Sequence, residues 1–301
     1  MSKKLPGFDP RQEMRRGDYE IAHKQDTYLK NVELHHHDFY EVYFLLSGDV
    51  TYTIEGRIYH VMPGDMLIIN PRELHQVGIR PDMAPYERYV LWIAPSLMET
   101  LSTPDTDLCA CFDQFRPGYS NQLHLTGSQR DAVRPMMEMI YQETERSDFG
   151  GDVLSYHLLS ALMILVNRIA QQGGIRYPVP EQGSQLVSQV IDYLNLHYSE
   201  SCSLDGLADQ FYISKYHLSH EFNKHMGIGL YQYLQRKRLV IARQLMSQGK
   251  KPVEVYAQCG FEDYAGFYRA FRRIYGKSPR EYIQSLKTVP EELTVEENIK
   301  A

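Results

Sequence analysis

The segments "ISKYHLSHEFNKHMG" (residues 213–227) and "EDYAGFYRAFRRIYG" (residues 262–276) follow one pattern, 49 residues apart. In each, a helix-capping residue, Ser214 or Asp263, is followed at four and eight positions by apolar or aromatic side chains, and a glycine closes the pattern. A repeat of this period indicates a duplicated supersecondary unit.

A short apolar stripe precedes each cap, so each copy predicts two helices joined by a tight turn, which is the helix-turn-helix pattern. The same register aligns Ala208 with Ala257. We expect both alanines to lie where the two helices of a unit cross closely, with no room for a larger side chain. Gly260 is expected to supply the turn of the second unit.

The second helix of each unit is expected to expose a face without carboxylates. At about 100° per residue, positions two, six and nine after the cap point away from the apolar side. Their side chains suit base edges in a major groove, and Arg269 could grip a guanine with two hydrogen bonds. The alternative is an amphipathic helix whose polar side binds nothing. The positions are Tyr216, His220 and Asn223 in the first helix and Ala265, Arg269 and Arg272 in the second, flanked by Ser219, Tyr264 and Tyr268.

Between the units, "LYQYLQRKRLVIARQLM" (residues 230–246) predicts one long helix. Such a helix would hold the two second helices about 34 Å apart, one turn of DNA. Nearby basic residues are candidates for phosphate contacts, with solvated charges or internal ion pairs as the alternative. The candidates are Lys215, Lys224, Arg236, Lys237, Arg272, Arg273 and Lys277, while Arg238 could be structural.

Charge is unevenly distributed along the chain. Residues 186–287 contain 14 Lys and Arg against 9 Asp and Glu, a surplus of five, and the whole chain carries −6, which leaves −11 elsewhere. This asymmetry favours a polyanion-binding C-terminal part.

The motifs "LADQFYISKYHLSHEFNKHMG" (207–227), "RLVIARQLM" (238–246) and "VYAQCGFEDYAGFYRAFRRIYGKSPREY" (255–282) resemble the AraC/XylS family of bacterial transcription regulators. The resemblance covers residues 186–287 and implies binding to promoter or operator DNA. Gly229 departs from the Ser or Pro common in the family, and Ala265 is a weak reader, so no operator sequence carries over. By the family pattern, base contacts fall on Tyr216, Ser219 and His220 and on Tyr264, Ala265 and Arg269.

Residues 18 to about 95 predict short strands. In "VTYTIEGRIYHV" (50–61), apolar and polar side chains alternate, and Glu55-Gly56 supplies turn chemistry. From Ser128 the period becomes helical, and two helices on either side of Gly150-Gly151 predict a hairpin. Its apolar surface is expected either to pack within the chain or to form a dimer interface.

The stretch "LHHHDFYEVYF" (residues 34–44) is typical of one wall of a ligand site. On a single strand, His35, His37 and Glu41 would share one side, and His36 would face outward to the surface. Together with "PGD" (63–65) and His75, their order resembles the motifs of cupins, although Leu29 and Ile79 depart from the full pattern. In metal-binding cupins, three such histidines and the glutamate hold one ion, and this donor set suits Fe, Mn, Ni or Zn.

Three interpretations of these residues stay open. They form a divalent metal site of His35, His37, Glu41 and His75, they line an effector pocket without metal, as is common in AraC-type regulators, or they are hydrogen-bonded barrel residues without a ligand. Aromatic side chains facing inward could stack on a sugar-like or aromatic effector. The candidate effector pocket comprises His35, His37, Glu41, Tyr43, Tyr52, His75 and Trp92.

The expected fold class is α+β multidomain, with an N-terminal cupin-like β-barrel and helical hairpin and a C-terminal all-α domain of two helix-turn-helix motifs. The expected boundaries are 1–125 for the effector-sensing barrel, 126–171 for the hairpin, 172–185 for a linker, 186–288 for the DNA-binding domain and 289–301 for a polar tail.

The function expected from this organisation is a non-enzymatic transcription regulator that responds to a small-molecule effector. Activation is the expected mode, and repression stays open as the alternative. The runner-up is a cupin metalloenzyme, an oxygenase or isomerase, with an appended nucleic-acid module, and a third hypothesis is an adaptor that binds another protein. Expected partners are double-stranded DNA, RNA polymerase and a second copy in a homodimer. With no apparent secretory signal, no apolar run of about 18 residues and four scattered cysteines, a cytoplasmic location without membrane contact is expected.

Overall fold

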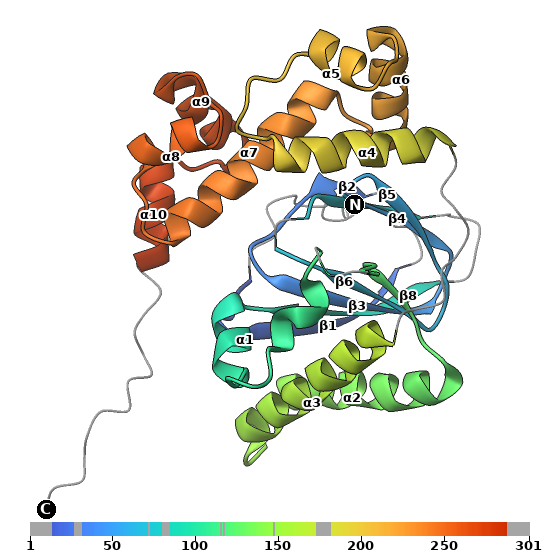
Figure 1. Ribbon diagram of the computed structural model, residues 1–301. Coiled ribbons are helices and arrows are strands. Elements are labelled where there is room, and N and C mark those ends of the chain that lie inside the picture. Colours follow the sequence, from blue (N-terminus) through green and yellow to red (C-terminus); the bar gives the residue numbers. More distant parts are fainter. Residues whose placement is uncertain are drawn as a thin grey trace, which may run out of the picture. The chain divides into compact units, whose positions relative to one another are not determined.

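The computed structural model describes residues 14–26, 32–71, 73–79, 85–114, 116, 118–146, 148–172 and 182–287 (Figure 1). The chain forms two compact units, Met1–Leu194 with Leu204–Leu230 and Asn195–Ser203 with Tyr231–Ala301. The first contains the β-sheets, the helical hairpin and the first helix-turn-helix, and the second contains the other helix-turn-helix. Most of the expected linker and all of the expected tail lie outside the described residues.

Two antiparallel sheets face each other in the first unit (Figure 1). Side chains from both sheets meet in one buried cluster that includes Tyr43, Leu67, Tyr52 and Val77. The five-stranded sheet has the order β1-β8-β3-β6-β9 and the four-stranded sheet the order β2-β7-β4-β5. The strands are β1 (Tyr19–Asp26), β2 (Val32–His35), β3 (Tyr40–Ser47), β4 (Val50–Ile54), β5 (Arg57–Val61), β6 (Asp65–Ile69), β7 (His75–Ile79), β8 (Tyr86–Ile93) and β9 (Gln122–His124).

Strand β3 shows how the five-stranded sheet is covered on both faces. Tyr43 and Leu45 point to the four-stranded sheet, whereas Val42 and Phe44 belong to a second core on the opposite face. This is the two-residue period of a strand with both sides buried, which explains why "VYFLL" is a continuous apolar run.

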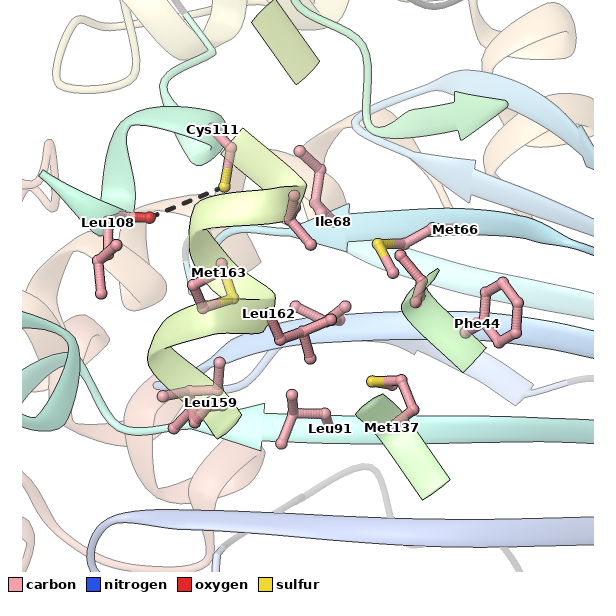
Figure 2. Packing of buried hydrophobic residues seen from close by; sticks show 14 of the residues in the cluster. Phe44, Met66, Ile68, Leu91, Leu108, Cys111, Met137, Leu159, Leu162 and Met163 are labelled. Carbon is pink, nitrogen blue, oxygen red and sulfur yellow. Dashed lines mark hydrogen bonds between the residues drawn. The ribbon is translucent and has the colours of Figure 1, made fainter. Parts of the chain in front are cut away.

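Helices cover the other face of the five-stranded sheet (Figure 2). Met137 of α2 (Gly127–Glu145) and Leu159, Leu162 and Met163 of α3 (Gly151–Gln171) pack against strand residues such as Leu91. A reciprocal capping box between Thr126 and Gln129 begins α2. The helices here are α1 (Pro95–Leu101), the 3₁₀ helix η1 (Leu108–Phe112), α2 (Gly127–Glu145) and α3 (Gly151–Gln171).

Helix α3 is long and apolar enough to cross a membrane by composition alone, with a mean hydropathy of 1.5. Nine of its residues are buried, and several of them belong to the core beneath the sheet. The helix is therefore explained as a core element. Val153, Leu154 and Ile164 nevertheless stay exposed on its other side.

Seven further helices follow in the described residues. In the first unit, α4 (Gln182–Leu196) packs on the turn between β4 and β5. A Cβ on Gly56 of that turn would lie only 2.3 Å from Ile191 Cδ1. Ser188 Oγ donates a hydrogen bond to the carbonyl of Gly56, and Arg57 pairs with Asp192 at 3.3 Å. The helices are α4 (Gln182–Leu196), α5 (Leu204–Gln210), α6 (Lys215–Met226), α7 (Leu230–Ser247), α8 (Pro252–Gln258), α9 (Tyr264–Tyr275) and α10 (Pro279–Lys287).

The two helix-turn-helix motifs match in their second helices but differ in their turns. Helices α6 and α9 both have 12 residues, with a cap that accepts a backbone N–H and a left-handed glycine at the C-terminus. Their supporting helices α5 and α8 are 48 rather than 49 residues apart, because the second turn has one more residue. The register of 49 therefore misaligns the supporting helices. Ala208 is buried as expected, but Ala257 is exposed, so its predicted crossing role is wrong.

Candidate functional site

The three consecutive histidines lie where the chain passes from one sheet to the other. Strand β2 ends at His35 in the four-stranded sheet, and β3 begins at Tyr40 in the five-stranded sheet. His37 and Phe39 therefore lie in a connection, and the single-strand alternation expected for residues 35–41 is wrong. His36 is 9% exposed and thus buried, so its predicted surface position is wrong too.

Four of the predicted pocket residues still come together, because residues 36–39 pass from one sheet to the other and bring His37 beside His75 and Glu41. His35 and His75 are register partners on β2 and β7, with ring centroids 4.2 Å apart. The ring of His37 lies 4.9 Å from that of His75 and stacks on Phe39. His37 Nε2 and Glu41 Oε2 are 3.2 Å apart. A tighter set of His37, Glu41 and His75 has one ligand atom from each residue within 4.8 Å of the others.

Backbone carbonyls orient two of the imidazoles. His37 Nδ1 lies 2.8 Å from the carbonyl of Phe39, and His75 Nδ1 lies 2.9 Å from the carbonyl of Glu73. A carbonyl only accepts, so Nδ1 carries the proton in both rings. The Nε2 atoms consequently point into the cluster, and neither has a hydrogen-bond partner among the described residues.

The carboxylate of Glu41 is buried and anchored by its neighbours. Trp92 Nε1 donates to Glu41 Oε2 at 2.8 Å. Burial alone would raise the pKa of Glu41, but the neighbouring histidines, above all His37, bring that pKa down to about 2. Burial and the adjacent histidines hold the pKa of His75 well below its usual value. The site therefore holds an anionic carboxylate beside a neutral imidazole.

Deeper between the sheets lies a cluster of tyrosines. The hydroxyl of Tyr43 donates to that of Tyr86 at 3.1 Å, and the ring of Tyr52 is 5.1 Å from that of Tyr43. Burial, followed by the neighbouring hydroxyls, raises the pKa of Tyr43 and of Tyr52 well above the usual value. These groups are neutral hydrogen-bonding hydroxyls in an apolar shell.

The structure adds two residues to this cluster that the sequence did not single out. Arg88 lies over the ring of Tyr86, 3.9 Å from its centroid, and pairs with Asp26. The two-residue period of a strand places Tyr86, Arg88 and Val90 on one side of β8, and Tyr86 and Val90 both belong to the cluster between the sheets. A count of inward positions along β8 would have found them.

The exposed residues of α6 and α9 match the predicted reading faces. Tyr216, His220 and Asn223 are exposed on α6, and Ala265, Arg269 and Arg272 on α9, while Ser219 and Tyr268 are partly buried. No exposed residue of either helix is acidic. Ser214 Oγ and Asp263 Oδ1 accept hydrogen bonds from the N–H groups of His217 and Gly266, as the cap positions predicted.

The candidate phosphate contacts divide into exposed and engaged residues. Lys224, Arg272 and Lys277 are exposed, as is Lys215, although its ammonium pairs with Asp205 at 2.9 Å. Lys237 is only 5% exposed, so the prediction that it contacts phosphate does not fit the structure. Arg236 is partly buried, and Arg273 donates to Gln235. The structural role suggested for Arg238 fits, because its guanidinium binds the carbonyls of Tyr198 and Glu200.

Comparison with known proteins covers both parts of the chain. Residues 19–147 match an AraC-like ligand binding domain, and residues 207–285 match a helix-turn-helix domain. The HTH-type transcriptional activator RhaS of Salmonella arizonae is 24% identical over 85% of this chain and 89% of its own length. The uncharacterized HTH-type transcriptional regulator YbfI of Bacillus subtilis is 26% identical over 76% of this chain and 78% of its own. Fatty-acid-bound ToxT of Vibrio cholerae shares 13% identity over 93% of this chain and 100% of its own, with a TM-score of 0.40.

Proposed function

Since this chain belongs to the AraC family of transcription regulators, we propose that α6 and α9 read an operator sequence while the space between the two sheets receives a small-molecule effector. The observation that carries the proposal is that α6 and α9 have the same length, are both capped by a side chain at the N-terminus, and expose no carboxylate. Phosphates repel carboxylates, and base edges offer partners to Arg, Asn, His and Tyr.

Base contacts are assigned to Tyr216, Ser219, His220, Asn223, Tyr264, Ala265 and Arg269. Phosphate contacts are assigned to Lys215, Lys224, Arg272 and Lys277. Arg273, which is exposed but bonded to Gln235, and the partly buried Arg236 are secondary candidates. Arg269 is the strongest single reader, because an exposed guanidinium can bind guanine O6 and N7 together, which is worth about 1–3 kcal/mol of discrimination.

The effector pocket is assigned to the buried polar groups between the sheets, with Glu41, Trp92 and the tyrosines as recognition groups. Contact between α4 and the β4–β5 turn supports coupling, because it joins a strand pair of the sensor to the helix that leads into the DNA-binding part. An effector shifts DNA binding only if it binds two arrangements unequally.

One of the two relatives is named a transcriptional activator and the other a transcriptional regulator. These names support a regulator over the metalloenzyme alternative. We extend the proposal to activation through RNA polymerase, to a cytoplasmic location and to a homodimer. The apolar residues left exposed on α3 support an interface on the hairpin.

A gel-shift experiment on DNA upstream of the gene tests the readout. We expect Arg269→Ala to lose about 1–3 kcal/mol of binding to the preferred site and to lose preference at one base pair. Arg134→Ala is the matched control, since Arg134 is an exposed arginine of α2, outside both helix-turn-helix motifs. Unchanged discrimination in Arg269→Ala would remove the assigned readout.

A further inference from the structure

His37, Glu41 and His75 form a buried group with an unusual balance of donors and acceptors. Their exposed fractions are 1%, 5% and 2%. Both Nδ1 atoms donate to backbone carbonyls, so a neutral ring presents only a lone pair at Nε2. The cluster thus contains an anion and two acceptor atoms.

The contact between His37 and Glu41 does not supply the donor that the two Nε2 atoms lack. Their Nε2 and Oε2 atoms are 3.2 Å apart, yet His37 Nε2 makes no hydrogen bond of acceptable geometry with any described residue. An extra proton on His37 would give an ion pair with Glu41, but His75 Nε2 would still lack a donor among the described residues. A buried acceptor without a partner costs about 1–3 kcal/mol. One cation among the three groups satisfies all of them.

The donor set identifies the kind of cation. Two imidazoles and one carboxylate are ligands for first-row transition ions such as Fe, Mn, Co, Ni and Zn, whereas Ca²⁺ and Mg²⁺ prefer oxygen only. Ligand atoms bonded to one ion at about 2.1 Å lie roughly 3 Å apart. The three atoms here lie within 4.8 Å of one another, so small side-chain rotations bring them onto one ion.

The surroundings already hold the ligands as a metal site requires. Metal-binding histidines donate their second N–H to a carbonyl or carboxylate, which fixes the ring and its tautomer. Phe39 and Glu73 provide those carbonyls, and Trp92 fixes the carboxylate. His35, whose ring lies beside His75, is outside the set of three.

We propose that His37, Glu41 and His75 bind one divalent first-row transition-metal ion in the sensor domain. The ion joins β3, which carries Glu41, to β7, which carries His75, and three protein ligands leave coordination positions for an oxygen or nitrogen of the effector. Metal binding itself is independent of the proposed function, but the use of the ion as part of the effector pocket rests on it.

Full-length protein treated with a chelator and dialysed is titrated with Co²⁺, with visible absorption and melting temperature as readouts. We expect one Co²⁺ per chain, displacement by Zn²⁺ and a higher melting temperature. Loss of an outer partner of a ligand alone costs about 10–100-fold in affinity, so His75→Gln and Glu41→Gln should weaken binding by at least about tenfold. His36→Gln is the matched control, a buried histidine next to the set and outside it.

Far-UV circular dichroism establishes that each variant is folded, and quenching of Trp92 by Co²⁺ gives a second readout in Glu41→Gln. The proposal is overturned if the wild-type chain binds Co²⁺ no more tightly than His75→Gln, or if His36→Gln loses binding equally. Gel shifts with the same variants separate the two proposals. Retained operator binding without metal binding overturns the metal site alone, and retained metal binding with no effect of Arg269→Ala overturns the DNA readout alone.

Discussion

Trp92 donates a hydrogen bond to Glu41 across neighbouring strands, where the two residues are register partners on β8 and β3. The chain contains one tryptophan. Its emission therefore comes from a side chain in contact with the buried carboxylate, and the proposed effector pocket contains its own fluorescent reporter.

An effector that enters the pocket should change the intensity or wavelength of tryptophan emission, because it alters the surroundings of the indole. The measurement is a fluorescence titration of the full chain with compounds that change its DNA binding in gel shifts. Trp92→Phe should abolish the signal and weaken the site, since a hydrogen bond to a charged group contributes about 1.5–3 kcal/mol. A compound that alters operator binding without altering emission would place the effector elsewhere.

The N-terminal caps of α6 and α9 should each contribute to the stability of the fold. Ser214→Ala and Asp263→Ala each remove an acceptor for an N–H in the first turn, and we expect each to lower the free energy of unfolding by about 1 kcal/mol. Urea unfolding followed by circular dichroism measures the effect. Glu262→Ala, an exposed neighbour of the cap, should leave stability within about 0.5 kcal/mol. Equal losses in Glu262→Ala and Asp263→Ala would contradict the capping role.

Lys224 and Arg272, which are assigned to phosphate contacts, should act through salt-dependent attraction rather than through base recognition. Lys224→Ala and Arg272→Ala should each reduce the slope of log K against log salt by about 1 and weaken all DNA sequences alike. Binding isotherms at several salt concentrations measure both effects, with Arg134→Ala as the control that keeps the slope. If the slope is unchanged in a variant, the residue that was replaced does not contact phosphate.

Two left-handed glycines should differ in their tolerance of a methyl group. Gly227 has φ of +67° and nothing within 4 Å of an added Cβ, so Gly227→Ala should cost only about 1–2 kcal/mol for the conformation. Gly260 has φ of +78°, and its Cβ would lie 2.8 Å from the carbonyl oxygen of Ser199. Gly260→Ala should therefore be the more destabilising variant in the same urea experiment, and the reverse order would contradict the tight turn.

The four cysteines should react with a thiol reagent in two classes. Burial raises the pKa of Cys259 to about 12 and that of Cys111 further, so few thiolates form at these positions at pH 8. Cys109 and Cys202 are partly exposed. Native protein should show two faster thiols and two that react only after unfolding, and single Cys→Ser variants assign them. Fast labelling of Cys259 would contradict its buried position.

The duplicated helices could be predicted from the sequence because capping and the 3.6-residue period are local properties. Ser214, Asp263 and the closing glycines fix the ends of α6 and α9 without reference to the rest of the fold. The alignment of the supporting helices α5 and α8 was harder to predict, because a one-residue difference in the turn moves Ala257 from the expected crossing to the surface. The prediction that Lys237 contacts phosphate did not fit for a related reason. The side of a long helix that becomes buried depends on the elements that pack against it, and these are not local in the sequence.

The sequence predicted which polar residues come together in the sensor domain, but not how the chain brings them together. His35, His37, Glu41 and His75 meet as expected, but through a crossing between sheets that strand alternation cannot show. The choice of sheet for β2 and β3 depends on long-range pairing, which also buries His36. Tyr86 and Arg88 were overlooked because their role appears only once β8 is placed beside β3.

The exposed faces of α6 and α9 carry different chemistry, Tyr216, His220 and Asn223 on one and Ala265, Arg269 and Arg272 on the other. Two identical readers related by a two-fold axis would accept a site equally well from either end. The unlike faces proposed as readers here would give the complex a polarity, so that reversing the operator beside a promoter would turn the sensor and its surfaces the opposite way along the DNA.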